Sequence, residues 1–444
     1  MTGVGDLASS PLLRNRNYVL FLAGHSTSVL GNAMASVALA FAVLAGTGSL
    51  TYMGLVLSAR ILPLVVFLLA GGIIGDRFPR RLVMVSADCV RCGTQAALAV
   101  ALLSGVADLW ILLAISVLNG IGEAVFTPAY NSLMPSLVPA HKLVRANALL
   151  NAMNSTANVA GPALASVAVA FVAPAVVLLI DAASFLPSIV ALLLIRVPDV
   201  KRKEQASVLD DLRHGWRTFT SWTWLWVITM QFTLFNLIVW APYLVLGPAS
   251  AARSYGGAGS WGIVLSLYGA GAVVGGLSLM GRSPTRPLLV ATLATLTWIA
   301  PSAALAAQAP LPAVAGGAFL AGVSSAVFNT LFFTTVQRAV PADSLSRIMS
   351  YVAFGAYSVG PIGLAVAGPV AELTSISLVL WIGVAWQLFA STVIVSLRAV
   401  RGFRVDPSPH RDGRGPLRRL FRRNGVATAA VADVATEDHG GRVT

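Results

Sequence analysis

Six ionisable side chains lie inside long apolar segments of this chain, where an unpaired charge is costly. They are His25, Arg60, Asp88, Arg91, Glu123 and Asp181. In an apolar membrane interior a charged side chain costs about 2.5–3.5 kcal/mol on insertion scales, so each of these residues needs a partner, a proton or a function. Carboxylates in such a place can bind and release protons, and guanidinium groups can neutralise them.

Asp88 and Arg91 stand three residues apart, so on a helix they share one face and are expected to form a structural ion pair. Glu123 lies at a depth similar to that of Arg91, estimated from the rise of about 1.5 Å per helical residue. Its carboxylate could be protonated in apolar surroundings and pair with Arg91 or Arg60 when ionised, which would couple proton release to a rearrangement. Glu123 is therefore the first candidate for proton coupling, and a static ion pair is the alternative. The full candidate set for proton coupling is Glu123, Asp181, Asp88 and Arg91.

Asp181 and His25 are weaker candidates for proton transfer. Asp181 lies near the end of its apolar segment, so a simply solvated carboxylate is the alternative. His25 could titrate near neutral pH, but a hydrogen-bonded histidine at a helix interface is the commoner outcome.

Amides and aromatic side chains on several apolar segments could line a central cavity. Amides inside a bilayer must find partners, so hydrogen bonds between helices are the alternative. A cavity of amides and aromatics with few fixed charges would suit a bulky amphipathic or weakly basic compound. The candidates are His25, Asn32, Arg60, Asn158, Asn236, Trp240 and Asn329, with Asn154, Gln231, Phe41, Tyr268, Phe333 and Tyr357 as further polar or aromatic surface.

The elements that must position these residues are apolar segments long enough to cross a bilayer. Charged residues make up 11% of the 444 residues and hydrophobic residues 57%, whereas a soluble domain has roughly 25% charged residues. A spanning helix needs about 20 mostly apolar residues. The sequence therefore predicts an all-α membrane protein with twelve transmembrane helices, at 18–45, 51–75, 82–104, 108–133, 143–171, 175–196, 222–247, 259–280, 287–307, 311–336, 348–371 and 375–397.

Basic residues fall on alternate connections between these segments, as expected when Lys and Arg are retained on the cytoplasmic side. The predicted outer connections hold only Arg253. The leader 1–17 is polar, and the segment after it is too long for a signal peptide core, so both termini are predicted to be cytoplasmic. This topology accounts for the net charge of +13 without nucleic-acid binding. The predicted inner connections hold Arg77, Arg80, Arg81, Lys142, Arg145, Lys201, Arg202, Lys203, Arg213, Arg217, Arg282, Arg286, Arg338 and Arg347.

Two pairs of similar segments relate the halves of the chain. Residues 138–145 resemble 340–347, and 76–81 resemble 281–286, each pair at the same connection of its half. Parallel repeats of this kind indicate six plus six helices, with chance similarity of apolar segments as the alternative. The predicted divisions are a leader at 1–17, bundles at 18–196 and 222–397, a linker at 197–221 with an amphipathic helix on the inner membrane surface, and a basic, disordered tail at 398–444.

The chain offers no catalytic constellation. Cys89 and Cys92 have CxxC spacing but lie in an apolar run, which disfavours a redox or metal role. A G-x-x-x-x-G-K-[ST] loop is absent from the sequence, so this chain is not predicted to hydrolyse ATP, although a separate ATPase subunit stays open. No catalytic residue, metal or cofactor is predicted, and the chain is not expected to be an enzyme.

The connection Gly72-Ile73-Ile74-Gly75-Asp76-Arg77-Phe78-Pro79-Arg80-Arg81 resembles the signature motif of the major facilitator superfamily: Gly, three residues, Asp-Arg and a basic pair. Four further runs, at 87–91, 126–129, 145–148 and 181–185, are similar to the branch of macrolide and siderophore exporters. The chain departs from that branch at Asn32, where many relatives carry an acidic residue.

The resemblance implies a secondary active transporter that exports small amphipathic molecules by alternating access, with proton antiport. Its gating motif would comprise Gly72, Asp76, Arg77, Arg80 and Arg81, with Asp76 meeting the helix that starts near Arg347, and Gly161-Pro162 resembles an antiporter element. The implied partners are a small-molecule substrate, the proton and membrane lipid, in a monomer of the inner cell membrane. An importer or facilitator of the same fold, a non-transporting receptor or membrane enzyme, and sodium in place of the proton are the alternatives.

Overall fold

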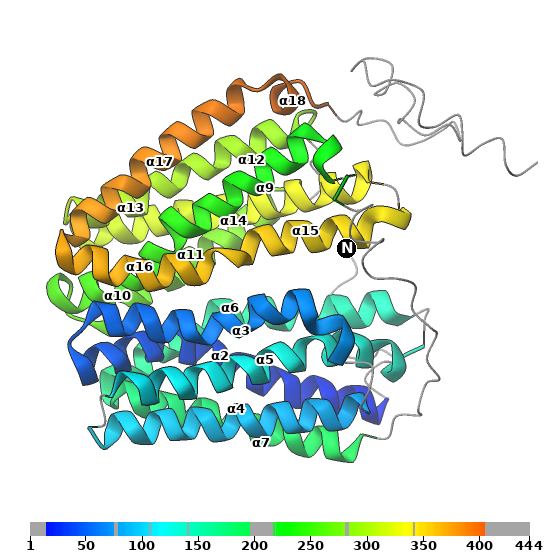
Figure 1. The fold of residues 1–444 in the computed structure, drawn as a ribbon, viewed down its shortest axis with the longest axis vertical. Coiled ribbons are helices and arrows are strands. Elements are labelled where there is room, and N and C mark those ends of the chain that lie inside the picture. Colours follow the sequence, from blue (N-terminus) through cyan, green and yellow to red (C-terminus); the bar gives the residue numbers. More distant parts are fainter. Residues whose placement is uncertain are drawn as a thin grey trace, which may run out of the picture.

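The computed structural model describes residues 15–74, 79–105, 108–139, 142–195, 216–217, 219–279, 284–340 and 342–404. Every regular element in those ranges is a helix, and the helices form two layers side by side (Figure 1). The first layer, called here the N-terminal bundle, contains α2 Arg16–Thr47, α3 Leu50–Ile74, α4 Arg80–Leu103, α5 Leu109–Leu137, α6 Leu143–Phe171 and α7 Pro174–Leu194.

The second layer, called here the C-terminal bundle, is coloured green to orange in Figure 1. Three of its long helical segments are interrupted and consist of consecutive shorter helices. Its elements are α9 Thr223–Phe235, η2 Asn236–Trp240, α10 Ala241–Ser254, α11 Ala258–Ser278, α12 Pro287–Thr295, η3 Leu296–Trp298, α13 Ile299–Ala306, α14 Leu311–Ala339, α15 Ala342–Ser358, α16 Gly360–Leu373, α17 Ile376–Ser396 and α18 Arg398–Arg401.

Within the described ranges, nine helices are long and apolar enough to cross a membrane. The predicted segment at 143–171 coincides with α6, and the other predicted boundaries mostly lie within a few residues of helix ends. α3, α4 and α6 are not among the nine. α4 carries Arg80, Arg81, Asp88 and Arg91 and has a low mean hydropathy for a spanning helix. All-helical architecture with multiple membrane-spanning helices is thus confirmed.

Three predicted segments lie in candidate membrane spans but are interrupted α-helices. The segment at 222–247 contains the π-helical η2 and extends to Ser254. The segment at 287–307 contains the 3-10 turn η3 just before Pro301, whose missing N–H removes a helical hydrogen bond. The segment at 348–371 breaks at Val359, directly before Gly360-Pro361.

The two bundles meet closely where α3 crosses α16. A Cβ atom on Gly54 would collide with the carbonyl oxygen of Leu364, and one on Gly368 would collide with that of Leu50. Glycine at both positions therefore lets the backbones of the two bundles touch. This crossing lies toward the end of the molecule that carries residues 48–49, 255–257 and 374–375, which the charge pattern predicts to be extracellular and which we call the predicted outer end.

The predicted linker and terminal segments lie mostly outside the described residues. Of the linker, Phe219 is buried and stacks with Trp216, and both rings contact Tyr351 of α15. The tail was predicted to be disordered from residue 398, but its first residues form α18, followed by Phe403 packed on Trp224. An aromatic contact therefore anchors the start of the tail to the C-terminal bundle.

Candidate functional site

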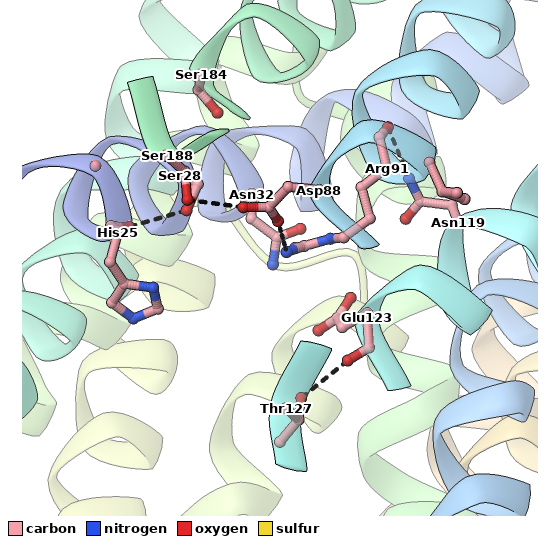
Figure 2. Close-up of polar contacts among 12 residues, drawn as sticks. His25, Ser28, Asn32, Asp88, Arg91, Asn119, Glu123, Thr127, Ser184 and Ser188 are labelled. Atoms are coloured by element: carbon pink, nitrogen blue, oxygen red, sulfur yellow. Dashed lines mark hydrogen bonds and ion pairs between the residues drawn. The ribbon is translucent and has the colours of Figure 1, made fainter. Parts of the chain in front are cut away.

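A buried ion pair lies at the centre of the N-terminal bundle (Figure 2). Arg91 Nη1 is 3.3 Å from Asp88 Oδ1, the contact that the spacing of three residues on α4 predicts. Ser188 Oγ of α7 donates to Asp88 Oδ2 at 2.7 Å, so both carboxylate oxygens have partners. Asp88 is 0% exposed. A charge so deeply buried is tolerated because it is both paired and hydrogen-bonded.

Aromatic rings hold the guanidinium group of Arg91. Its Cζ atom lies 4.4 Å from the ring centroid of Phe185 and 5.5 Å from that of Phe126. Cation–π contacts of this kind stabilise a desolvated arginine. The arginine is therefore fixed from α5 and α7 as well as by its own helix.

Asp181, on α7, is a second buried carboxylate of the N-terminal bundle. It is 1% exposed, so the alternative of a simply solvated carboxylate is wrong. Ser184 Oγ donates weakly to its Oδ1 at 3.4 Å, and its Oδ2 has no hydrogen-bond partner among the described residues. The neighbouring α2 can approach because position 31 is glycine: a Cβ there would lie 2.8 Å from Asp181 Oδ1.

Arg60 and Asn32 join α3 to α2. The guanidinium group of Arg60 donates a short hydrogen bond to Asn32 Oδ1, and both side chains are half-buried. Asp181 interacts electrostatically with Arg60 and, less strongly, with Arg91. The side-chain oxygen of Asn32, on α2, therefore accepts a hydrogen bond from the positively charged Arg60 of α3.

Glu123 lies on α5, next to the ion pair (Figure 2). Its neighbour Gly122 packs against α4, where a Cβ would lie 2.7 Å from Arg91 Cγ. The Glu123 side chain is half-buried and interacts electrostatically with Asp181, and within the described residues its carboxylate has no ion pair or hydrogen bond. The expected pairing with Arg91 or Arg60 is therefore not formed in this conformation.

His25 sits in an aromatic stack rather than at a hydrogen-bonded interface. Its ring lies 4.6 Å from that of Tyr130 and 5.7 Å from that of Phe21, nearly parallel to the latter. Its buried Nδ1 atom has no hydrogen-bond partner in the part of the chain that the structure describes. The alternative of a hydrogen-bonded histidine is therefore wrong for Nδ1.

The predicted cavity residues of the C-terminal bundle make contacts within their own helices and with neighbouring aromatic rings. Asn236 Nδ2 donates to Phe232 O one turn earlier, at 2.9 Å, and Trp240 meets Trp298 edge to face at 5.2 Å. Asn329 is exposed and donates to Ser325 O at 2.8 Å. On α6 of the other bundle, Asn158 is also exposed.

Only part of the predicted gating motif can be placed. Asp76 and Arg77 lie outside the described residues, and Gly72 lies in the last turns of α3. Arg80 begins α4, and Arg81 Nη1 donates to Ile195 O at 2.8 Å, at the end of α7. Arg81 therefore satisfies a carbonyl at a helix C-terminus, where a cation is favoured.

Gly161 lets α6 lie directly against α2. A Cβ at position 161 would come to 2.5 Å from Ala33 Cβ, and Pro162 follows within the same continuous helix. The predicted antiporter element thus forms a tight helix crossing beside Asn32.

Comparison with known proteins decides the family. Residues 8–426 match the family model described as transmembrane secretion effector. The chain belongs to this family of major facilitator transporters. The chain is 22% identical over 391 residues to macrolide efflux protein A of Streptococcus pyogenes, and the alignment covers 85% of this chain and 93% of the relative. It is 24% identical over 366 residues to the multidrug efflux pump Tap of Mycolicibacterium fortuitum, covering 80% and 89%.

Solved structures of transporters share the fold of this chain. A bacterial homologue of the iron transporter ferroportin, in an inward-facing state, superposes with a TM-score of 0.68 at 18% identity, covering 87% of this chain and 99% of that one. The nucleoside transporter NupG superposes with a TM-score of 0.66 at 14% identity, with the same coverage. The protein is therefore a membrane transporter with efflux-pump relatives and not an enzyme.

Sequence reasoning missed one contact between the two bundles. Glu372, at the end of α16, accepts hydrogen bonds from Leu50 N at 2.7 Å, Thr51 N at 3.1 Å and the hydroxyls of Ser49 and Thr51. A carboxylate is stabilised at a helix N-terminus because the backbone N–H groups there are unpaired. The sequence signal was present in the Ser49-Leu50-Thr51 start of α3, but the carboxylate partner comes from the other half of the chain.

Proposed function

We propose that this chain exports amphipathic small molecules across the inner cell membrane by alternating access, driven by proton antiport. The observation that carries the proposal is a charge imbalance inside the N-terminal bundle. Three carboxylates lie near two guanidinium groups, and one of the three is fully paired. The set comprises Asp88, Asp181, Glu123, Arg60 and Arg91.

The imbalance supports uptake of one proton. With every group ionised, the cluster carries one net negative charge, and an uncompensated charge is expensive in apolar surroundings. Binding of one proton makes the cluster neutral. A state in which the cluster faces water favours proton release, and a state in which it is closed off favours the protonated form.

Glu123 and Asp181 together are the proposed proton site. They interact as like charges, and in our proposal one bound proton relieves that repulsion. In our proposal Glu123, which is half-buried, exchanges the proton, and Arg60 compensates Asp181 when it is charged. The Asp88–Arg91 pair stays ionised and holds α4, α5 and α7 in register.

Amides and aromatic rings support an amphipathic substrate. Asn32 and Arg60 of the N-terminal bundle, and Asn236, Trp240 and Asn329 of the C-terminal bundle, are the proposed polar and aromatic surface that meets the compound. His25 and Asn158 belong to the same proposed surface. Efflux of macrolides and multiple drugs, as the relatives' names state, favours compounds of this kind.

The proposed architecture has twelve spanning helices, with α3, α4 and α6 completing the set, and both termini in the cytoplasm. We further propose that a monomer is the working unit, in which the bundles at 18–196 and 222–397 rock about their contact. The Glu372 cap would hold the predicted outer end closed. Asp76, by resemblance, would hold the inner end closed in the opposite state.

The test is uptake of lipophilic dyes and antibiotics into inverted membrane vesicles, with and without an imposed proton gradient. Export by proton antiport requires gradient-driven uptake in the wild type and its loss in Glu123→Gln. Asp108→Asn is the matched control, because it changes another acid to an amide at the exposed start of α5, where Asn also caps a helix. Equal uptake without a gradient would establish a facilitator instead.

A further inference from the structure

A basic segment lies at the end of the C-terminal bundle opposite the predicted outer end, which we call the predicted inner end. It follows α17 directly and carries Arg398, Arg401 and Arg404, called here the arginine cluster. All three side chains are exposed, and within the described residues none of their guanidinium groups has a hydrogen bond or an ion pair. Arg398 and Arg401 stand three residues apart on α18, so they share one face of it. Half-buried Arg286 begins α12, against which α18 packs.

Apolar contacts fix the arginine cluster on the bundle. Val400, between two of its members, is 0% exposed and belongs to the hydrophobic core at this end. The ring of Phe403 lies 5.3 Å from that of Trp224. α18 packs against α9, α12 and α17, and Figure 1 shows it beside the end of α17. The arginines therefore project outward from a fixed turn of the chain.

The described structure offers the arginine cluster no negative partner. Among the carboxylates whose side chains are described, three lie inside the N-terminal bundle and two lie toward the predicted outer end. They are Asp88, Glu123 and Asp181, and Asp108 and Glu372, respectively. The cluster is therefore open to an anion from outside the described part of the chain.

Tryptophan side chains mark the level of the arginine cluster relative to a bilayer. Trp222 and Trp224 lie at the start of α9, with their rings 5.8 Å apart, and Trp224 is the residue that contacts Phe403. Tryptophan is enriched where a bilayer meets water, because its ring is apolar and its N–H group is polar. Basic side chains at that level attract the anionic lipids of the cytoplasmic leaflet.

Exposed apolar side chains continue from the arginine cluster along the two helices that α18 contacts. Val290 and Leu293 lie on α12, and Phe389 and Val393 lie on α17, each 37–61% exposed. The two helices also pack against each other. A phospholipid can contact the arginines with its phosphate and this apolar surface with its acyl chains, whereas a soluble phosphate compound can contact only the arginines.

We propose that the arginine cluster, together with Arg286, binds the phosphate of an anionic phospholipid. Guanidinium groups donate paired N–H hydrogen bonds to phosphate oxygens, and such charge-assisted bonds are stronger than neutral ones. The bound lipid would link α18 to α12 and so brace the predicted inner end of the C-terminal bundle. The inference goes beyond the proposed function, and it depends only on the chain being a membrane protein.

The test measures lipid binding to the full chain in detergent by native mass spectrometry. The probes are dioleoyl-phosphatidylglycerol and dioleoyl-phosphatidylcholine, which have the same acyl chains and differ in the net charge of the head group. We expect the wild type to bind the first phosphatidylglycerol at least about tenfold more tightly than the first phosphatidylcholine. Equal affinities for the two lipids would overturn the proposal.

A pair of double variants separates a site from general attraction to positive charge. Arg398→Gln with Arg401→Gln should weaken phosphatidylglycerol binding roughly thirtyfold, because each basic side chain near an anionic surface contributes a factor of roughly five. Arg217→Gln with Arg338→Gln is the matched control, since it removes two exposed charges at the same end from other elements. The control should bind like the wild type. Equal losses in both double variants would overturn the proposal.

Glycerol 3-phosphate distinguishes a lipid from a soluble phosphate compound, because it carries the phosphate without acyl chains. We expect it to leave phosphatidylglycerol bound. If it displaces the lipid while sulfate at the same ionic strength does not, the cluster binds soluble phosphates and the lipid site is refuted. None of these outcomes depends on the direction or the driving force of transport, so the lipid site and the proposed antiport can fail separately.

Discussion

The two bundles are both built from packed helices but differ in the chemistry of their interiors. The N-terminal bundle buries carboxylates and guanidinium groups, with Asp88 and Arg91 in direct contact. The described interior of the C-terminal bundle instead holds amides, hydroxyls and aromatic rings, among them the buried Gln387, which donates to Thr295 O. A charged interior responds to protons, whereas an uncharged one offers hydrogen bonds at every pH. The difference teaches that two helical bundles of one chain can bury different chemistry while each stays closely packed.

The largest expected effect is on the ion pair. Arg91→Met leaves the Asp88 carboxylate with Ser188 as its remaining partner, and breaking a buried pair costs about 3–5 kcal/mol. We expect a steep fall in the thermal unfolding midpoint in nanodiscs. The double variant Asp88→Asn with Arg91→Met removes both charges and should recover most of the loss. If Arg91→Met unfolds at the same temperature as the wild type, Asp88 is already neutral. The contrast between a charged and an uncharged bundle interior would then be wrong.

The next effect concerns the helix crossing that buries Asp181. Gly31→Ala places a Cβ against Ser184 Oγ and Asp181 Oδ1, and overpacking of this kind costs about 1–3 kcal/mol. Both stability and gradient-driven uptake should fall. Gly93→Ala is the control, because a Cβ at position 93 of α4 meets nothing within 4 Å. Indistinguishable midpoints for the two variants would show that α2 and α7 separate without cost.

A smaller effect is expected at the contact between the bundles. Glu372→Ala removes the cap of α3, worth about 1 kcal/mol and less where water screens it, so opening of the predicted outer end should become up to about fivefold more populated. Ser250 is buried in the cleft at that end. Labelling of Ser250→Cys by an impermeant maleimide, with Cys89 and Cys92 replaced by Ala, measures the opening.

The matched control for the cap is Thr374→Ala, since the Thr374 hydroxyl bonds only within its own turn, to Val370 O. It should label like the parent protein. Unchanged labelling in Glu372→Ala would mean that the glycine crossing alone keeps this end closed.

The smallest effect is expected in the uncharged bundle. Gln387→Met removes the hydrogen bonds to Thr295, and side-chain hydrogen bonds between membrane helices average about 0.6 kcal/mol. The unfolding midpoint should change several-fold less than in Arg91→Met. A loss as large as that of Arg91→Met would remove the energetic difference between the bundles.

Much of the fold could be predicted from apolar segment length, because a bilayer demands helices of one size. The ion pair of Asp88 and Arg91 could be predicted equally well, since both residues lie on one helix three positions apart. Contacts between distant segments were not: nothing near Glu372 in the sequence indicates that it caps Leu50 and Thr51. The burial of Asp181 was also missed, because depth along a helix does not reveal which face meets another helix.

The π-helical stretch η2, between α9 and α10, has a consequence for how such chains diversify. A π turn accommodates an extra residue within a continuous helix, and each helical residue turns the chain by about 100°. The wider turn at 236–240 absorbs a residue that would otherwise rotate everything after it by that angle, so α9 and α10 can keep their faces when the helix gains or loses one residue here. A change of length by one codon is therefore a step that this stretch can take without turning the side chains on either side of it.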